Sequence, residues 1–422
     1  TGQANKGLLE LGEVALFDLE GNRVNLSASA SPLFDEQETV PEKTTYYDSA
    51  YFDEIYHPRT AWEHIRGIEP YEISHPPLGK LIMGVGIRLF GMTPFGWRFM
   101  GTLFGVGMLP LLYVFLKNLF GRTSIATCGT VLLAADFMHL TQTRLATIDT
   151  YAFFFILLMY YFMYRYLTLP AGAPFRKCAL PLFLSGLFWG IGAASKWTVI
   201  YGCTGLVLYF IGLYQKLRDW PADGETGARQ PGRLKWAFQI LAFSVLVFAL
   251  IPAAIYTLSY LPYAWAEGDS SLTGLVGAMW ENQKYMLSYH SGVTDTHPYS
   301  SRWYQWLFDI RPILYYMDNS VPGYTTRFAA FVNPVVCWGG LLAVLACAVQ
   351  AVRRRCARAL FIVIGYLAQL VPWFFIGRIT FAYHYFPSVL FLILALCYVF
   401  YSLSEQEELI AWKPAMYAVT AG

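Results

Sequence analysis

The sequence predicts an all-α polytopic membrane protein with a short β fragment at its N-terminus. Of the 422 residues, 56% are hydrophobic and only 14% are charged, whereas about a quarter of the residues of a soluble domain are charged. The hydrophobic residues gather after residue 96 in stretches long enough to cross a bilayer. The net charge of +2 is too close to zero to favour nucleic acid as a partner.

The first 50 residues are polar in character. Residues 1–30 predict two short strands around the turn Glu20-Gly21-Asn22, and such a hairpin cannot bury a core alone. We therefore expect a fragment of a soluble β-domain in residues 1–30 and a linker in residues 31–50. The chain lacks an initiator Met and ends in an apolar stretch that begins near residue 414, so we expect both ends to be truncated.

Residues 51–96 are expected to form an external catalytic loop. It contains the adjacent carboxylates Asp53 and Glu54 and the later segment His75-Pro76-Pro77-Leu78-Gly79-Lys80. An enzyme that takes a proton from a hydroxyl at a membrane surface needs such a carboxylate. The apolar stretch 78–91 is shorter than the roughly 20 residues of a span and predicts an interfacial helix instead.

Residues 97–422 are expected to form the transmembrane domain, and the distribution of Lys and Arg orients it. Basic residues are concentrated in alternate loops, which is typical of cytoplasmic loops. The long loop 259–327 and the loop with Asp53 then lie on the extracytoplasmic side of a cell membrane. The predicted spans are 97–118, 123–140, 147–168, 179–195, 197–214, 236–258, 328–350, 359–376 and 383–402, with a tenth beginning near 414.

Single charged residues at span ends converge on the outer face that carries Asp53. A charge at the centre of a bilayer costs about 2.5–3.5 kcal/mol on insertion scales, and less at the rim. Snorkelling to water explains any one of them, but the set favours a site in which basic side chains hold a phosphate. These residues are Arg98, Asp136, Arg144, Asp149, Lys196 and Arg378.

The histidines and aromatic residues leave alternatives open. Glu54, His57 and His64 could sit near one helix face and hold a metal, but this interpretation is disfavoured and no metal site is predicted. For His75, which precedes two prolines, a structural hydrogen bond is favoured over a ligand role. The aromatic loop 259–327 either anchors at the bilayer interface or covers a site. Tyr383-His384-Tyr385 likewise suits donor binding and interfacial anchoring equally.

Several of these segments resemble, in order and spacing, the protein O-mannosyltransferase family of the GT-C superfamily of polyprenyl-phosphate-dependent glycosyltransferases. The resemblance covers roughly residues 50–422 and implies a GT-C-like transmembrane helix bundle. Loop 259–327 is too short for the lumenal sugar-binding domain of eukaryotic members, so a bacterial type is expected. The segments are Phe52-Asp53-Glu54-Ile55-Tyr56, His75-Pro76-Pro77-Leu78-Gly79-Lys80-Leu81, Trp97-Arg98-Phe99, Gln142-Thr143-Arg144-Leu145 with Asp149, His297-Pro298-Tyr299-Ser300-Ser301-Arg302-Trp303 with Arg311-Pro312, and Arg378 with Tyr383-His384-Tyr385.

The resemblance implies inverting transfer of a mannosyl or other hexosyl group from a polyprenyl-phosphate sugar to a hydroxyl, expected to be Ser or Thr of an exported polypeptide. Asp53 would be the general base, and Glu54 would orient it or the acceptor. Donor phosphate would be bound by Arg98, Arg144, Lys196 and Arg378. Further candidates for substrate binding are His75, Lys80, Asp149, His297, Arg302, Arg311 and His384.

Other interpretations remain. No cofactor is required in this mechanism, although a divalent metal stays an alternative because related oligosaccharyltransferases use one. The same donor chemistry with a lipid, glycan or cell-wall acceptor is the second interpretation. A transporter is less favoured, because transporters place charges near the bilayer midplane and often contain an internal repeat. A scaffold protein would leave the outer-face charges unexplained.

Overall fold

The computed structural model describes residues 14–24, 34, 37, 40, 47–221, 232–294, 296–319 and 323–405. The chain divides into two units, residues 1–50 and 51–422. In the first unit, a single antiparallel bridge joins Phe17 to Arg23. The Asp18 carboxylate closes the turn between them by accepting hydrogen bonds from the backbone N–H of Glu20 and Asn22. Of the strand pair predicted in residues 1–30, the described residues contain this one bridge. The other residues of the prediction lie outside the described part of the chain.

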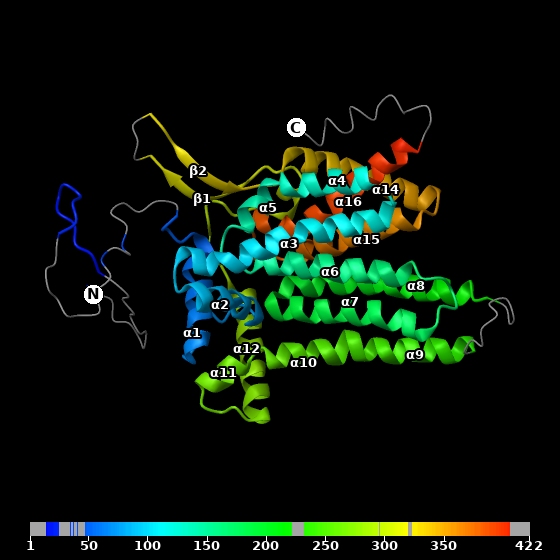
Figure 1. The fold of residues 1–422 in the computed structure, drawn as a ribbon, viewed down its shortest axis with the longest axis horizontal. Helices are drawn as coiled ribbons and strands as arrows, with labels where there is room; N and C mark the ends of the chain where they lie inside the picture. The colour runs from blue at the N-terminus through cyan, green and yellow to red at the C-terminus, as the bar shows by residue number, and fades with distance from the viewer. Residues whose placement is uncertain are drawn as a thin grey trace. The chain divides into compact units, whose positions relative to one another are not determined.

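The second unit is a bundle of long helices with shorter elements gathered at one end (Figure 1). The long helices are α3 (Pro94–Phe120), α4 (Thr123–Ala134), α6 (Asp149–Leu167), α7 (Phe175–Ser195), α8 (Leu206–Arg218), α9 (Arg233–Val245), α10 (Ile251–Leu258), α14 (Gly340–Arg353), α15 (Ala357–Leu370) and α16 (Phe386–Ser404). Short helical segments extend several of them, namely η3 (Trp197–Gly205), η4 (Leu246–Leu250), η5 (Val335–Gly339), η6 (Val371–Phe375) and η7 (Ala382–Tyr385).

The elements at the end of the bundle come from two parts of the chain. The first part supplies η2 (Phe52–Ile55), α1 (His57–Arg66) and α2 (Leu78–Phe90), and α5 (Phe137–Gln142) follows α4. The predicted loop 259–327 supplies α11 (Leu261–Ala266), the 21-residue helix α12 (Leu272–Gly292), α13 (Trp303–Trp306) and the start of a hairpin. That hairpin pairs β1 (Ile313–Asp318) with β2 (Thr326–Ala330) in antiparallel register. The predicted helix 78–91 is confirmed as α2.

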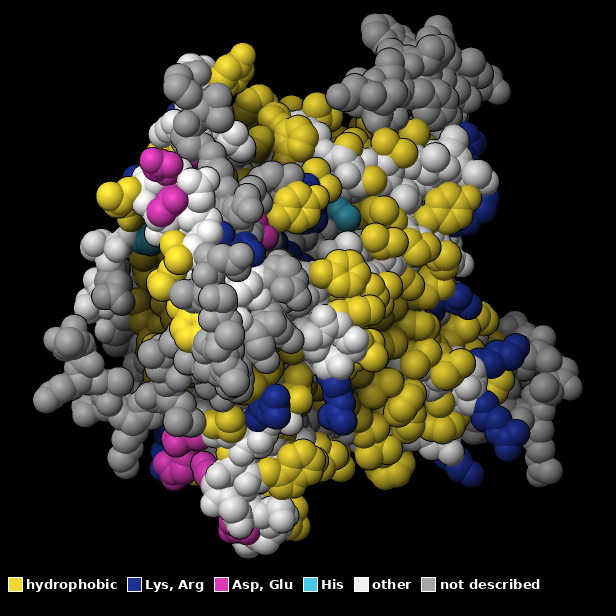
Figure 2. Space-filling view, turned by 60° about the vertical axis from the view of Figure 1, so that its left-hand side comes forward, with side chains coloured by type: hydrophobic (Ala, Val, Ile, Leu, Met, Phe, Trp, Pro, Cys, Tyr) yellow, Lys and Arg dark blue, Asp and Glu magenta, His cyan; other side chains and the backbone are white. Residues whose placement is uncertain are grey.

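Seven helical stretches in the described part of the chain are long and apolar enough to cross a membrane. They are Pro94–Phe120, Phe175–Ser195, Trp197–Arg218, Arg233–Ala266, Val335–Arg353, Ala357–Phe375 and Ala382–Ser404. Hydrophobic side chains accordingly cover much of the helical body on the face drawn in Figure 2. The predicted multi-pass, mainly helical architecture is confirmed.

Three predicted spans differ from the structure. The span 123–140 breaks after α4, because Asp136 is buried and starts α5 by accepting a hydrogen bond from the backbone N–H of His139. The span 147–168 is a helix, α6, but it is not among the seven, because it contains several tyrosines and has Asp149 and Arg165 in its first and last turns. The span 328–350 was placed too early, because residues up to Ala330 belong to β2. The predicted tenth span lies outside the described residues.

The interior of the bundle is built on α16, whose side chains from Phe386 to Tyr398 are buried. On the other side of the bundle, α7 packs against α6 and against the joined helices α9 and α10. Gly186 permits this approach, because a Cβ there would lie 2.1 Å from the carbonyl oxygen of Val247. Small residues at such contacts let membrane helices pack closely, and this packing fixes the ends of α6 and α7 that reach the pocket described next.

Candidate active site

A pocket of about 1080 Å³ lies at the end of the bundle where the short elements gather. Its wall combines η2, the start of α1, the loop 71–75, residues 196–201, the C-terminal half of α12 and the segment 373–384. The charged side chains that line it are Asp53, Glu72, Lys196 and Arg378, accompanied by His57, His75, His290 and His384. Segments far apart in the sequence therefore bring acids, bases and cations to one cavity.

Asp53 is presented to this pocket by a constrained backbone. The preceding residue, Phe52, has φ of 50°, which is uncommon for a residue other than glycine and is often found at functional sites. The Phe52 ring holds this turn through edge contacts with Phe381 at 5.1 Å and His297 at 5.5 Å between centroids. Burial raises the pKa of Asp53, while the nearby His57 and Lys196 oppose the rise. Asp53 is therefore a stronger base than an exposed aspartate.

Glu54 points away from the pocket into the protein. Its carboxylate accepts two hydrogen bonds from the Arg98 guanidinium, at 2.9 and 2.7 Å, and one from the backbone N–H of Ala146 at 2.7 Å. A bidentate pair of this kind fixes orientation as well as adding energy. Glu54 thus ties η2 to α3 and to the segment before α6, and it positions the neighbouring Asp53.

Two of the four predicted phosphate-binding cations line the pocket. Lys196 Nζ lies 2.6 Å from Asp149 Oδ1 and 5.3 Å from the centroid of the Tyr383 ring. Arg378 also lines the pocket, and within the described residues no carboxylate lies within ion-pair distance of it. Arg98 faces Glu54, and Arg144 is exposed; neither lines the pocket.

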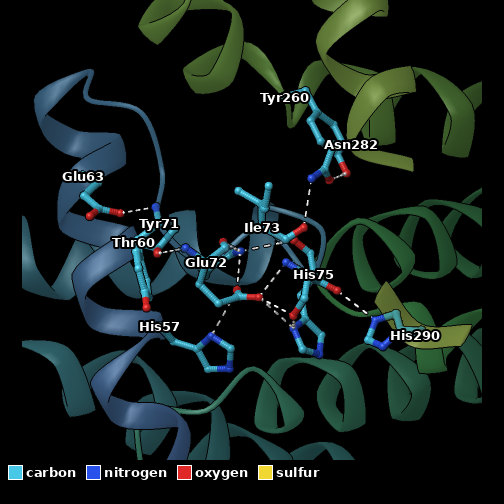
Figure 3. Close-up of polar contacts among 12 residues, drawn as sticks. His57, Thr60, Glu63, Tyr71, Glu72, Ile73, His75, Tyr260, Asn282 and His290 are labelled. Atoms are coloured by element: carbon cyan, nitrogen blue, oxygen red, sulfur yellow. Dashed lines mark hydrogen bonds and ion pairs between the residues drawn. The ribbon is translucent and has the colours of Figure 1, made fainter. Parts of the chain in front are cut away.

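A buried ionic cluster around Glu72 forms another wall of the pocket (Figure 3). Glu72 Oε2 accepts a hydrogen bond from Lys80 Nζ at 2.7 Å and lies 3.6 Å from His57 Nδ1. Glu72 Oε1 accepts from the backbone N–H of Ser74 at 2.7 Å and lies 3.3 Å from His75 Nδ1. Burial alone would raise the pKa of Glu72, but Lys80 and His75 hold it well below its usual range. Lys80 is fully buried and also donates to the carbonyls of Glu72 and His75, so it holds the loop rather than lining the pocket.

Side chains from α1 and α12 pin the backbone of the loop that carries Glu72 (Figure 3). From α1, Thr60 Oγ1 accepts a hydrogen bond from the N–H of Glu72 at 3.0 Å. From α12, Asn282 donates to the Ile73 carbonyl and His290 to the Ser74 carbonyl, each at 2.9 Å. These hydrogen bonds hold the backbone of the loop in one arrangement beside the pocket.

The other predicted substrate-binding residues divide into two groups. His75 and His384 line the pocket, and the His384 ring packs against Tyr383 and Trp373. The remaining three, His297, Arg302 and Arg311, do not line it; Arg302 instead donates to the Gly377 carbonyl at 2.9 Å and so supports the segment that carries Arg378.

Sequence reasoning missed Glu72 and Tyr315. Glu72 is a carboxylate beside the His75-Pro76-Pro77 segment, but only the fold shows that it meets Lys80. Tyr315 comes from β1, and its hydroxyl accepts a hydrogen bond from Gln142 at 2.8 Å. Burial, followed by the nearby Asp149 and Asp53, raises the pKa of Tyr315 well above its ordinary value. The sequence pattern predicted a loop at residues 313–318 and placed Tyr315 only among the aromatic residues of loop 259–327, which either anchors at the interface or covers a site.

The chain matches two family models that together span most of the membrane domain. Residues 90–266 match the model described as dolichyl-phosphate-mannose-protein mannosyltransferase, and residues 275–421 match the C-terminal four-transmembrane region of protein O-mannosyltransferases. The chain belongs to the protein O-mannosyltransferase family. The resemblance drawn from the motifs is confirmed.

Curated relatives of this protein O-mannosyltransferase family member include bacterial enzymes. The polyprenol-phosphate-mannose–protein mannosyltransferase of Mycolicibacterium smegmatis is 27% identical over 82% of this chain and 76% of its own length. The enzyme of the same name from Mycobacterium tuberculosis is 26% identical over 84% of this chain and 72% of its own length.

Solved structures agree with the GT-C fold of this protein O-mannosyltransferase. The Saccharomyces cerevisiae Pmt1–Pmt2 complex, solved with its sugar donor, has a TM-score of 0.74 at 13% identity and covers 89% of this chain and 85% of its own. ArnT from Cupriavidus metallidurans, solved with undecaprenyl phosphate, has a TM-score of 0.54 at 16% identity, covering 84% of this chain and 56% of its own. The predicted GT-C-like helix bundle is confirmed.

Proposed function

We propose that this protein transfers mannose from polyprenyl-phosphate mannose to a hydroxyl group of a polypeptide, with inversion at the sugar carbon. The names of the curated relatives support the donor and the class of acceptor. The observation that carries the proposal is the pocket itself, where Asp53 faces the same cavity as Lys196 and Arg378. Transfer from a phosphate to a hydroxyl needs a base for the hydroxyl and positive charge for the departing phosphate.

In this mechanism Asp53 removes the proton of the acceptor hydroxyl as its oxygen attacks the sugar carbon. A hydroxyl is a poor nucleophile, so proton removal accompanies the attack. Glu54, held by Arg98, positions Asp53 and does not itself touch the substrate. These roles follow from the direction of each side chain, since Asp53 lines the pocket and Glu54 is buried against α3.

The departing polyprenyl phosphate gains charge in the transition state. Arg378 is the cation best suited to bind it, because the charge of Lys196 is balanced by Asp149. Lys196 lines the same pocket and would complete the site. In this proposal the protein's own cations neutralise the phosphate, and no metal is required. Turnover should therefore be equal with and without EDTA. A loss of turnover in EDTA that Mg²⁺ or Mn²⁺ restores would contradict the proposal.

We further propose that the pocket opens on the extracytoplasmic side of the cell membrane. Lys and Arg gather in and beside the loops between α3 and α4, between α6 and α7, and between α14 and α15, which favours the cytoplasmic side for the opposite end of the bundle. A single cysteine placed at exposed Tyr71, in a variant whose other cysteines are replaced, should react with a membrane-impermeant maleimide in intact cells.

The decisive experiment is sugar transfer in membranes. Radiolabelled polyprenyl-phosphate mannose and a Ser/Thr-rich peptide are supplied to the full-length protein and to Asp53→Asn. Label in the peptide that disappears in the variant supports both the activity and the base. Label in a lipid or glycan fraction instead would support the alternative acceptor. Absence of any transfer by the parent protein, with the donor still bound, would reject the proposed donor sugar or acceptor.

A further inference from the structure

The Glu72 cluster has no part in the mechanism above, although it shares the pocket with Asp53. The Glu72 side chain is 11% exposed, and its partner Lys80 is fully buried. Placing an ion pair in the interior costs desolvation energy that its attraction does not always offset. A charged pair of this kind beside a catalytic pocket therefore points to a role beyond stability.

His57 connects this cluster to Asp53. The 3-10 segment η2 leads into α1 through Tyr56, whose N–H bonds to the Asp53 carbonyl and whose carbonyl accepts a hydrogen bond from the N–H of Thr60. Asp53 in η2 and His57 at the first position of α1 both line the pocket. Among the ionisable neighbours of Asp53, His57 has the strongest electrostatic effect on it. His57 Nδ1 lies 3.6 Å from Glu72 Oε2.

After each transfer, Asp53 holds a proton that it must lose before the next turnover. The cations around it cannot take this proton, because Lys196 is paired with Asp149 and Lys80 with Glu72. Burial lowers the pKa of His75 to about 3, so that ring is a poor acceptor as well. Of the other imidazoles in the pocket, burial lowers the pKa of His290 to about 4, and Nδ1 of His384 is engaged by the backbone of Phe381. His57 remains as the acceptor, and Glu72 is placed to stabilise its protonated form.

We infer that His57, backed by Glu72, accepts from Asp53 the proton that Asp53 has taken from the acceptor hydroxyl. In the transfer, the hydroxyl O–H bond breaks, a bond forms from that oxygen to the sugar carbon, and the bond from the sugar carbon to the phosphate oxygen breaks with its electrons. Asp53 becomes a neutral acid, passes its proton to the imidazole, and returns to a carboxylate. The imidazolium, paired with Glu72, then releases the proton to water. This inference rests on the proposed function.

The two steps are separated by comparing the first turnover with later ones. The first transfer uses an Asp53 that is already a carboxylate, whereas every later transfer needs the proton to leave. In His57→Gln and Glu72→Gln, rapid mixing of donor-loaded protein with peptide should therefore give a first-turnover rate within about threefold of the parent. Steady-state turnover should fall by a factor on the order of ten to a hundred. Added imidazole should restore part of the loss in His57→Gln.

His64→Gln is the matched control, since His64 lies on the same helix and is buried, but does not line the pocket. It should leave both rates unchanged. If His57→Gln and Glu72→Gln also leave both rates unchanged, the proton departs with the phosphate and the inference is wrong. If both rates fall together, or if neither variant binds the donor with normal affinity, the pair is structural and the inference is equally wrong. Failure of the parent protein to transfer any sugar would instead reject the proposed function.

Discussion

Lys196 and Asp149 form a buried ion pair in the pocket wall, with 2.6 Å between Nζ and Oδ1. The pair joins the residue after α7 to the first residue of α6. Their side chains are only 6% and 8% exposed, so neither charge is well solvated if its partner is removed. Asp149 thus holds Lys196 in place and also balances its positive charge. Among the described residues, the positive charge of the pocket that no carboxylate balances comes chiefly from Arg378.

Removing only Lys196 should harm the protein more than removing the pair. Lys196→Gln leaves the Asp149 carboxylate buried and repelling the donor phosphate, and breaking such a pair costs about 3–5 kcal/mol of stability. The double variant Asp149→Asn/Lys196→Gln should recover most of the melting temperature and part of the donor affinity. Thermal unfolding and donor binding in detergent test this prediction; additive losses in the double variant would contradict it.

Arg378 should govern donor affinity. A hydrogen bond to a charged group contributes about 1.5–3 kcal/mol, so Arg378→Gln should weaken binding of polyprenyl phosphate by roughly tenfold to a hundredfold with an unchanged fold. Arg311→Gln is the control, because Arg311 does not line the pocket and bonds to the Pro298 carbonyl. Equal effects of the two substitutions would argue against a phosphate site at Arg378.

Asp53 should set the acidic limb of the activity profile. Only its carboxylate form accepts a proton, and burial raises its pKa above the ordinary 3.8. The value of kcat/KM should therefore increase with pH through a midpoint above 3.8, and it should level off once Asp53 is ionised. Asp53→Asn should lower kcat by about a hundredfold to ten-thousandfold while donor affinity stays near that of the parent. A variant that keeps the same acidic limb would assign the limb to another group.

Glu54 should act on activity through position and stability. Glu54→Gln keeps the shape of the side chain but weakens the bidentate contact with Arg98 and the bond from Ala146. We expect a lower melting temperature together with a reduced kcat, and an unchanged midpoint of the acidic limb. A shifted midpoint with normal stability would indicate that Glu54 takes part in proton transfer.

The sequence predicted the parts of the site that depend on local pattern. Asp53 was found because an acidic pair precedes an apolar chain, and Lys196 because a charge stands at the end of an apolar stretch. It could not distinguish Arg98 from Arg378 as pocket cations, since the difference lies in whether a carboxylate from a distant segment meets each one. Glu54 meets Arg98 across 44 residues of chain.

The same limit applies to the fold. Long apolar helices such as α3 and α16 follow from composition, because any bilayer span needs such a stretch. The break at Asp136 does not, since it depends on a buried carboxylate accepting hydrogen bonds from both His139 and the distant Asn333. The β1–β2 hairpin was missed because the apolar residues at the end of β2 were counted in the span predicted from residue 328, although Asn333 and Pro334 separate them from η5.

The Glu72–Lys80 pair should make stability depend on pH in the acidic range. The pKa of folded Glu72 lies well below its usual 4.5, so the stabilisation is fully present above about pH 4.5 and is lost as the pH falls through the lower folded value. Lys80→Met removes the cation that pairs with Glu72 and leaves a buried carboxylate. The variant should therefore melt at a lower temperature than the parent near neutral pH. Its deficit should shrink as the pH falls, because Glu72 of the variant becomes protonated while the parent loses the stabilisation that its charged Glu72 provides. Melting curves from pH 3 to pH 7 measure this, with Lys284→Met as the control because its ion pair with Glu281 is exposed. A deficit that stays constant across this range would mean that Lys80 stabilises the loop only through the carbonyls of Glu72 and His75.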